Sequence, residues 1–255
     1  MDKRIGAQFF TLREHMKTIE DFDSSCKKVA DMGYKIVQVS GVPLKAAEMR
    51  EVLDKHGLEV VTTHRGFDDF KNNIDEVIEY NKILGCELCG LGMMPTSYGD
   101  SKDSFKEFLK EAEKICEALK KENLYFGYHN HSFEFYKLDG QTIMDLLIKE
   151  TDPELFNFIV DTYWVQVGGK NPAKVIRELK GRAMAVHFKD VKISQPDWCI
   201  PQIADVGEGN LDWDDIISAC DEAGTKWALV EHDCTKDPFK TLENSYGYLK
   251  TKGFC

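Results

Sequence analysis

The chain repeats one local pattern, in which a stretch with helical spacing of apolar residues stops at a glycine or asparagine and a short β-branched or aromatic run follows. The runs after these stops are residues 34–39, 58–63, 86–91, 124–128, 182–186 and 225–230. Glycine and asparagine often end helices because they adopt the left-handed backbone conformation readily, and short runs of this composition are typical of strands. Two further runs, 5–10 and 156–160, bring the expected strands to eight.

Helices are expected between the strands, near residues 18–31, 46–56, 72–83, 101–122, 141–150, 172–180, 212–223 and 239–251. Strands that alternate with helices favour a parallel sheet with helical crossovers. The length of 255 residues and the lack of a Pro/Ser-rich linker favour one domain over 1–255, closed as a (βα)8 TIM barrel. An open doubly wound sheet is the alternative, although its usual glycine-rich nucleotide motifs do not occur in the sequence.

The charge balance limits the expected partners. The chain has 33 Lys and Arg residues against 44 Asp and Glu residues, a formal net charge of −11. This excess repels phosphate backbones and anionic lipids, so we expect neither nucleic acid nor a membrane as a partner, but a small molecule. No apolar run approaches the ~18 residues that span a bilayer, and a cytosolic protein with reduced cysteines is expected.

Polar and ionisable residues gather at one end of the expected strands. The strands begin at these residues: Tyr34, Leu58, Cys86, Leu124, Arg182 and Thr225. They end at these residues: Gln8, Gln38, His64, His129, Asp161, His187 and Glu231. In a TIM barrel the carboxyl ends of all strands meet on one face, where the active site lies. The asymmetry therefore predicts a site on that face.

Three of these residues predict a metal site. Asp161, His187 and Glu231 each follow directly on an apolar run, on the sixth, seventh and eighth expected strands. Two carboxylates and an imidazole suit a divalent ion such as Mn²⁺, Mg²⁺, Co²⁺ or Zn²⁺. The fifth strand offers further candidates, because its alternation places His129 and His131 on one side, with Glu134 beyond the strand end.

Four segments in order give the chain a resemblance to a known family. They are 127–135 (GYHNHSFEF), 161–164 (DTYW), 187–190 (HFKD) and 207–213 (GEGNLDW). With them, nearly the whole chain resembles the sugar phosphate isomerase/epimerase group of the xylose isomerase-like TIM barrels. This group includes inosose dehydratases, ketose 3-epimerases and a C-glycoside deglycosidase branch.

The resemblance implies a metal held by a Glu after strand five, an Asp after strand six, a His after strand seven and a Glu after strand eight. In this sequence these are Glu134, Asp161, His187 and Glu231, with Mn²⁺ as the favoured ion. Many relatives carry the first Glu at the strand end, where this chain has His129. Either Glu134 is the ligand beside a basic His131, or His129 is itself a ligand, and we favour Glu134. Trp164 stands where ketose 3-epimerases carry a substrate-binding His.

The implied chemistry is proton abstraction next to the carbonyl of a sugar or keto sugar, through a metal-stabilised enediolate. Glu231 or His131 would take the proton, and Lys189 would hydrogen-bond the oxyanion. The expected substrate contacts are Gln8, Gln38, His64, His129 and Trp164, and Trp198 is a further aromatic candidate.

We expect an isomerase or epimerase. The first alternative is a lyase, either a dehydratase or an enzyme that cleaves 3-oxo-glycosides or C-glycosides, with the same metal site. The second is a non-catalytic sugar-binding subunit, with residues 191–206 and Trp164 at an interface with a partner chain or a second copy.

Overall fold

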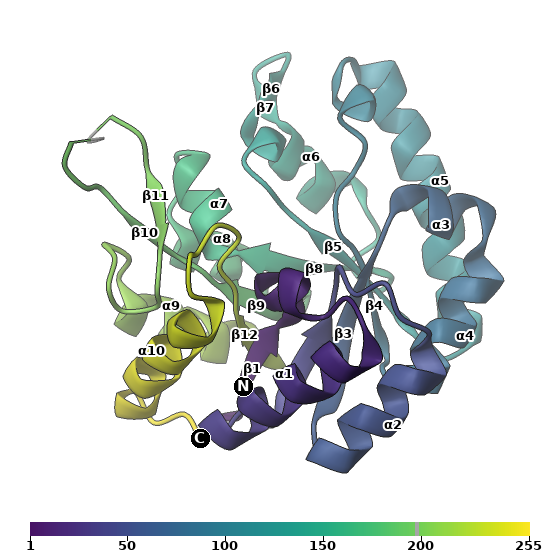
Figure 1. The fold of residues 1–255 in the computed structure, drawn as a ribbon. Coiled ribbons are helices and arrows are strands. Elements are labelled where there is room, and N and C mark those ends of the chain that lie inside the picture. The colour runs from purple at the N-terminus through teal and green to yellow at the C-terminus, as the bar shows by residue number, and fades with distance from the viewer. Residues whose placement is uncertain (197–198) are drawn as a thin grey trace.

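In the computed structural model, which describes residues 1–196 and 199–255, eight parallel strands close into a barrel (Figure 1). In order around the barrel they are β1 (Ile5–Gln8), β12 (Trp227–Val230), β9 (Ala183–Phe188), β8 (Phe156–Asp161), β5 (Tyr125–His129), β4 (Leu88–Leu91), β3 (Glu59–Arg65) and β2 (Ile36–Val39). Because β1 pairs with both β2 and β12, the sheet has no open edge. The predicted (βα)8 barrel is confirmed, and the open-sheet alternative is wrong.

Helices surround the barrel (Figure 1). They are α1 (Ile19–Met32), α2 (Ala46–His56), α3 (Phe67–Asn72), α4 (Ile74–Leu84), α5 (Lys102–Lys121), α6 (Ile143–Glu150), α7 (Thr162–Val167), α8 (Pro172–Glu178), α9 (Trp213–Ala223) and α10 (Pro238–Thr251). All the helices expected from the sequence are present, with ends that differ by a few residues. The short helices α3 and α7 were not expected, nor were the 3-10 helices η1 (Phe9–His15), η2 (Thr96–Gly99) and η3 (Phe133–Phe135).

Local side-chain contacts explain several helix ends. The side chains of Asn171 and Asp212 accept hydrogen bonds from backbone N–H groups in the first turns of α8 and α9, as N-cap residues do. Gly57 ends α2 with φ 64°, a left-handed conformation that residues with a Cβ atom rarely adopt. These contacts fix where each crossover helix turns back toward the next strand.

Apolar side chains fill the barrel interior. The cluster comprises Ile36, Val61, Leu88, Ile159, Met184, Ala185, Trp227 and Leu229. Glycines make room for it: a Cβ atom on Gly127 would lie 2.9 Å from Leu88 Cδ1 and 3.1 Å from Ile159 Cδ1. Leu88, Met184 and Trp227 lie toward the amino ends of their strands, so the polar residues at the carboxyl ends lie above this packed layer.

Two antiparallel hairpins belong to the connections after the strands. The first pairs β6 (Lys137–Leu138) with β7 (Gln141–Thr142), and the second pairs β10 (Asp190–Lys192) with β11 (Gln202–Ala204). The hairpin of β10 and β11 extends away from the barrel (Figure 1). It carries the exposed side chains of Ile193 and Ile200. Trp198 lies outside the described residues, so its expected role stays a prediction.

Two further expectations concerned membrane-spanning helices and disulfides. Within the described residues, no helix is both long enough and apolar enough to cross a bilayer. The cysteines form no disulfide in the described part of the chain, and Cys86 and Cys89 are buried among apolar side chains.

Candidate metal centre

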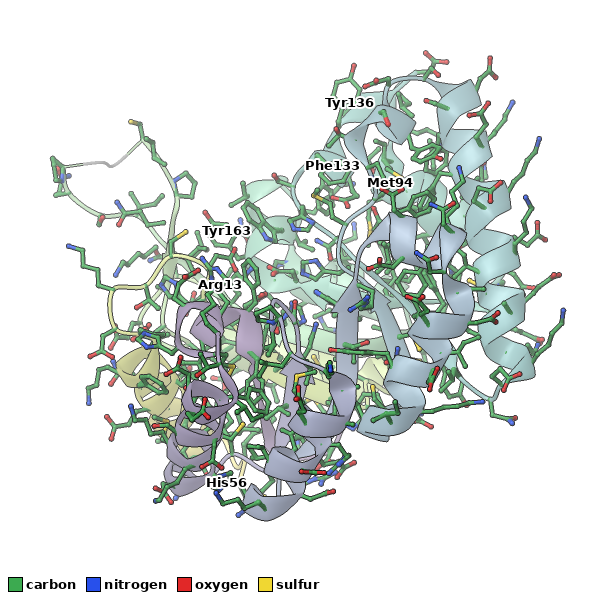
Figure 2. All side chains as sticks on the ribbon, turned by 45° about the vertical axis from the view of Figure 1, so that its right-hand side comes forward. Arg13, His56, Met94, Phe133, Tyr136 and Tyr163 are labelled. Carbon is green, nitrogen blue, oxygen red and sulfur yellow. The ribbon has the colours of Figure 1, made fainter. Side chains whose placement is uncertain are left out.

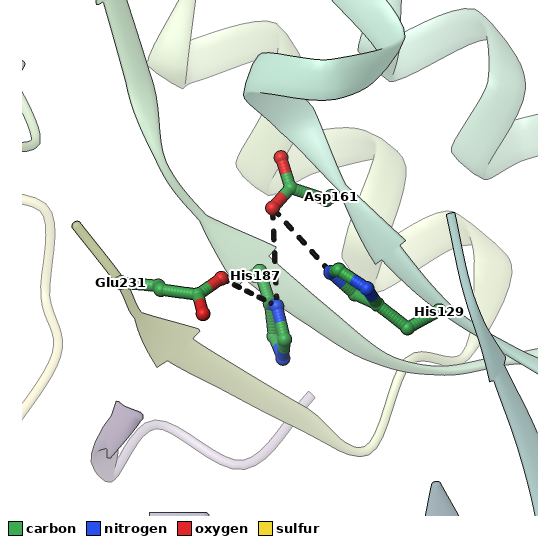
Figure 3. Close-up of side chains that lie close together, drawn as sticks. All are labelled: His129, Asp161, His187 and Glu231. Carbon is green, nitrogen blue, oxygen red and sulfur yellow. Dashed lines mark ion pairs between the residues drawn. The ribbon is translucent and has the colours of Figure 1, made fainter. Parts of the chain in front are cut away.

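Four side chains converge at the carboxyl ends of adjacent strands. His129 ends β5, Asp161 ends β8, His187 lies near the end of β9, and Glu231 directly follows β12 (Figure 3). Each offers one ligand atom, and the four atoms lie within 4.8 Å of one another. All four side chains are buried. The group therefore has the spacing and the nitrogen and oxygen donors that a divalent cation requires.

Carbonyl oxygens behind the two histidines determine which ring nitrogens face the group. His129 Nδ1 lies 3.0 Å from the backbone oxygen of Gly92, and His187 Nε2 lies 2.7 Å from Gln38 Oε1. A carbonyl oxygen only accepts hydrogen bonds, so each of these nitrogens carries the ring proton. His129 Nε2 and His187 Nδ1 consequently present lone pairs to the centre, the arrangement that metal-binding histidines use.

Apart from the nearby Lys189 ammonium, the inner atoms face one another without a compensating group in the described part of the chain. His129 Nε2, Asp161 Oδ2, His187 Nδ1 and Glu231 Oε2 are all buried, and none has a hydrogen-bond partner among the described residues. His187 Nδ1 lies 2.9 Å from Glu231 Oε2, so two lone pairs face each other at short range. A cation between them would turn this repulsion into attraction. The donor set therefore fits a divalent metal.

Lys189 lies beside the same carboxylates. Its Nζ atom is 2.9 Å from Asp161 Oδ2, 3.0 Å from Glu231 Oε2 and 3.1 Å from Asp233 Oδ2, and only the contact with Asp233 has hydrogen-bond geometry. Burial acts to lower the pKa of Lys189, but the three carboxylates outweigh it and raise this pKa above its ordinary value. Lys189 therefore carries a positive charge within the site.

His131 and Trp164 form one side of the site. Their ring centroids are 5.6 Å apart, and the His131 ring lies 4.7 Å from that of His129. His131 Nδ1 and Trp164 Nε1 are buried polar atoms without a hydrogen-bond partner in the described part of the chain. Burial lowers the pKa of His131 to about 3, so the imidazole is neutral near pH 7.

Glu134 lies apart from the four-residue group. It belongs to η3, where its Oε1 accepts a hydrogen bond from the Tyr128 hydroxyl at 2.7 Å and its Oε2 accepts one from the His131 backbone N–H at 2.8 Å. Burial raises the pKa of Glu134 to about 7. Of the two alternatives for the ligand from strand five, the structure brings His129 into the group, because the turn at η3 directs the Glu134 carboxylate toward Tyr128.

A cavity of about 550 Å³ opens onto this group. Its walls include the polar residues His64, His129, His131, Lys189, Glu231 and Asp233, a second charged set of Arg65, Asp68 and Asp69, and the apolar residues Phe10, Phe67, Met93 and Pro95. Such a volume suits a small organic ligand. Gln38 is fully buried behind His187, and Gln8 is fully buried with its Oε1 accepting from the Phe10 N–H. These two predicted substrate contacts therefore lie beneath the cavity surface.

Other residues show where the site ends. Figure 2 shows Tyr163 and Tyr136 toward one end of the barrel and His56, which pairs with Asp23 at 2.8 Å, at the opposite end. The Tyr163 hydroxyl donates to the backbone oxygen of Pro201, which links α7 to the chain between β10 and β11. His56 therefore takes no part in the site.

The sequence analysis missed one carboxylate of the site, Asp233. Asp233 reaches Lys189 from the connection after β12, and its position two residues after Glu231 is the only sequence signal for it. Asp190 instead accepts hydrogen bonds from the backbone N–H groups of Gly207, Gly209 and Leu211 and from Trp213 Nε1. The N–H groups of the 207–211 turn therefore bind an internal carboxylate.

The fold and the site together define a TIM barrel with a candidate metal centre at the carboxyl ends of its strands. Residues 26–252 match the family described as "Xylose isomerase-like TIM barrel", and the chain belongs to this family.

Individual relatives are more distant. An inosose dehydratase of Lacticaseibacillus casei is 25% identical over 186 residues, which cover 64% of this chain and 59% of that protein. The match therefore spans less than two thirds of the length of that relative. This relative is, by its name, an enzyme that dehydrates inosose.

Solved structures share the fold over nearly the whole chain. A sugar phosphate isomerase/epimerase from Parabacteroides distasonis superposes with a TM-score of 0.79 at 22% identity, covering 97% of this chain and 93% of that one. A xylose isomerase-like TIM barrel protein from Mycobacterium smegmatis, solved in complex with magnesium, gives 0.75 at 13% identity, covering 98% and 97%. At these identities the likeness establishes the fold.

Proposed function

We propose that this protein is a divalent-metal-dependent isomerase or epimerase that removes a proton next to the carbonyl of a sugar or keto sugar. One observation carries the proposal: four buried donor atoms face one another, and two of their residues, His129 and Glu231, line a cavity. The family membership and the enzymatic relatives support the same class of chemistry.

His129, Asp161, His187 and Glu231 would hold the ion. Two imidazoles with two carboxylates suit Mn²⁺, Co²⁺ or Zn²⁺ better than Mg²⁺, which prefers oxygen ligands, and Mn²⁺ is our first choice. When bound, the ion would supply Lewis acidity that lowers the energy of negative charge on a nearby substrate oxygen.

The protein groups around this centre have separate roles. His131 lines the cavity, and its Nδ1 has no hydrogen-bond partner within the described residues. It would take the proton from the substrate carbon. Lys189, which also lines the cavity, would donate a hydrogen bond to the enediolate oxygen. The indole of Trp164, next to His131, would contact the apolar face of a sugar ring and exclude water.

Elimination is a second candidate reaction. The relatives named inosose dehydratase support it, since loss of water from an enediolate that carries a β-hydroxyl is a dehydration. The same residues would serve, with the proton taken from carbon and a leaving group lost from the neighbouring position. A substrate without a β leaving group separates the two reactions, because only the isomerase or epimerase would convert it.

Metal content and solvent exchange test the proposal. We expect about one Mn²⁺ per chain after chelation and reloading, measured by elemental mass spectrometry, and loss of this ion in Glu231→Gln. In D₂O, the loaded wild type should incorporate deuterium next to the carbonyl of a keto sugar or cyclitol ketone, and His131→Ala should not. A wild type that binds no divalent ion refutes the metal centre. A loaded protein that exchanges no proton across such a panel favours the sugar-binding alternative.

A further inference from the structure

Lys189 contacts the same carboxylate oxygens that face the two histidines. Its ammonium lies 2.9 Å from Asp161 Oδ2 and 3.0 Å from Glu231 Oε2, the two atoms that a metal would use. Two cations cannot share these oxygens at short range without strong mutual repulsion. The Lys189 ammonium therefore competes with any divalent ion for the oxygens of Asp161 and Glu231.

Asp233 offers this ammonium another partner. Within the described residues, the Lys189 ammonium makes one contact with hydrogen-bond geometry: its Nζ donates to Asp233 Oδ2 at 3.1 Å. The Lys189 side chain is 1% exposed and that of Asp233 is 20% exposed, so Asp233 holds the ammonium from the cavity side of the carboxylates. A buried ammonium that leaves Asp161 and Glu231 would otherwise lack a counter-ion.

The charges around the centre agree with a divalent occupant. Asp161, Glu231 and Asp233 contribute three negative charges, Lys189 contributes one positive charge, and the two histidines contribute none once their inner nitrogens bind an ion. The sum is −2, which a divalent ion neutralises. Removing Asp233 would leave a surplus positive charge in the metal-bound site, and removing Lys189 would leave a negative one.

From these contacts we infer that Lys189 and Asp233 form a positioning pair that sets the metal affinity of the site. In the metal-free protein the ammonium acts as the counter-ion of Asp161 and Glu231. When a divalent ion binds, Asp233 retains the ammonium, and the N–H groups of Lys189 that no longer face the ligand oxygens become available to a substrate oxygen. The inference rests on the proposed metal centre and adds a role for Asp233 that the proposed reaction does not require.

Mn²⁺ affinity measured on four proteins tests this pair. The proteins are the wild type, Lys189→Met, Asp233→Asn and the double variant, and the free Mn²⁺ is followed by electron paramagnetic resonance. We expect Lys189→Met to lower the dissociation constant at least about tenfold and Asp233→Asn to raise it by about tenfold, the size typical of groups around metal ligands. In the Lys189→Met background, Asp233→Asn should change the affinity clearly less than it does in the wild type, because its partner is gone.

Control variants separate charge from structure. Lys189→Arg keeps the positive charge and should bind Mn²⁺ within about threefold of the wild type, and the circular dichroism of each variant reports whether it folds. If Lys189→Met misfolds, Lys189→Gln replaces it with the same expected tightening. Unchanged or weaker binding in a folded, charge-free variant overturns the inference, as does an equal effect of Asp233→Asn in both backgrounds. A wild type that binds no Mn²⁺ instead refutes the proposed metal centre itself.

Discussion

The buried carboxyl group of Glu134 should make the stability of the protein depend on pH. Glu134 is fully buried in η3, and burial raises its pKa to about 7 from an ordinary value of 4.5, although the Tyr128 hydroxyl and the His131 N–H partly oppose this. Between these two pH values the folded chain holds a proton that the unfolded chain has released. The free energy of unfolding therefore falls as the pH rises through this window.

The size of the effect follows from the two pKa values. A difference of about 2.5 pH units corresponds to about 3 kcal/mol, at about 1.4 kcal/mol for each unit. Glu134→Gln has the same shape, can still accept one of the two hydrogen bonds and never ionises. The wild type should therefore lose about 3 kcal/mol relative to this variant between pH 4.5 and pH 8.

Urea unfolding of the two metal-free proteins at several pH values between 4.5 and 8 measures this difference, with EDTA present throughout. Titrations of all other groups cancel when the variant is subtracted from the wild type. Glu107→Gln, on the exposed surface of α5, is the matched control, and its difference from the wild type should stay small at every pH. A wild type whose stability parallels that of Glu134→Gln across the range would refute the conclusion that this carboxyl is dehydrated.

Three further variants test how the centre is built. His129→Gln should lose Mn²⁺ and Glu134→Gln should keep it in elemental analysis, and the reverse pattern would return the ligand role to Glu134. Gln38→Leu removes the acceptor behind His187 and should weaken Mn²⁺ binding by about 10- to 100-fold, so an unchanged affinity would contradict the role of Gln38 in orienting the ring. Asp190→Asn should lower the free energy of unfolding in urea at pH 7 by about 3 kcal/mol, because this carboxylate accepts several buried N–H groups; a loss below 1 kcal/mol would contradict that account.

The barrel could be predicted because its signals are local and repeated. Helix stops and β-branched runs depend on neighbouring residues, so they locate most elements without knowledge of the fold. The prediction fails where one side-chain contact overrides composition. The apolar run 5–10 continues two residues beyond the first strand, because Gln8 Oε1 accepts the Phe10 N–H and starts η1 at Phe9. The segment after Asp161 has strand-like composition, but Asp161 Oδ1 accepts the Trp164 N–H and caps α7.

The site could be predicted only where the strand itself positions a residue. Asp161, His187 and Glu231 come together because each lies at or near a strand end, and the barrel closes those ends onto one axis. The choice between His129 and Glu134 depends on the turn after β5, where Glu134 pairs with Tyr128. Such a turn is determined by contacts between distant elements, which the spacing of residues in one sequence does not encode.

The charge balance of the site finally links its chemistry to the stability of the barrel. In the metal-free protein, Lys189 compensates only part of the negative charge of three neighbouring carboxylates, and buried charges without full compensation destabilise the folded state. An ion that binds only the folded chain stabilises it by about 2.7 kcal/mol at a free concentration 100 times its dissociation constant. The lone pairs that destabilise the metal-free site are the same ones that would bind the ion. The uncompensated negative charge that destabilises the metal-free protein is therefore also the source of its affinity for a divalent cation. A substitution that removes part of this negative charge should stabilise the metal-free protein and weaken metal binding.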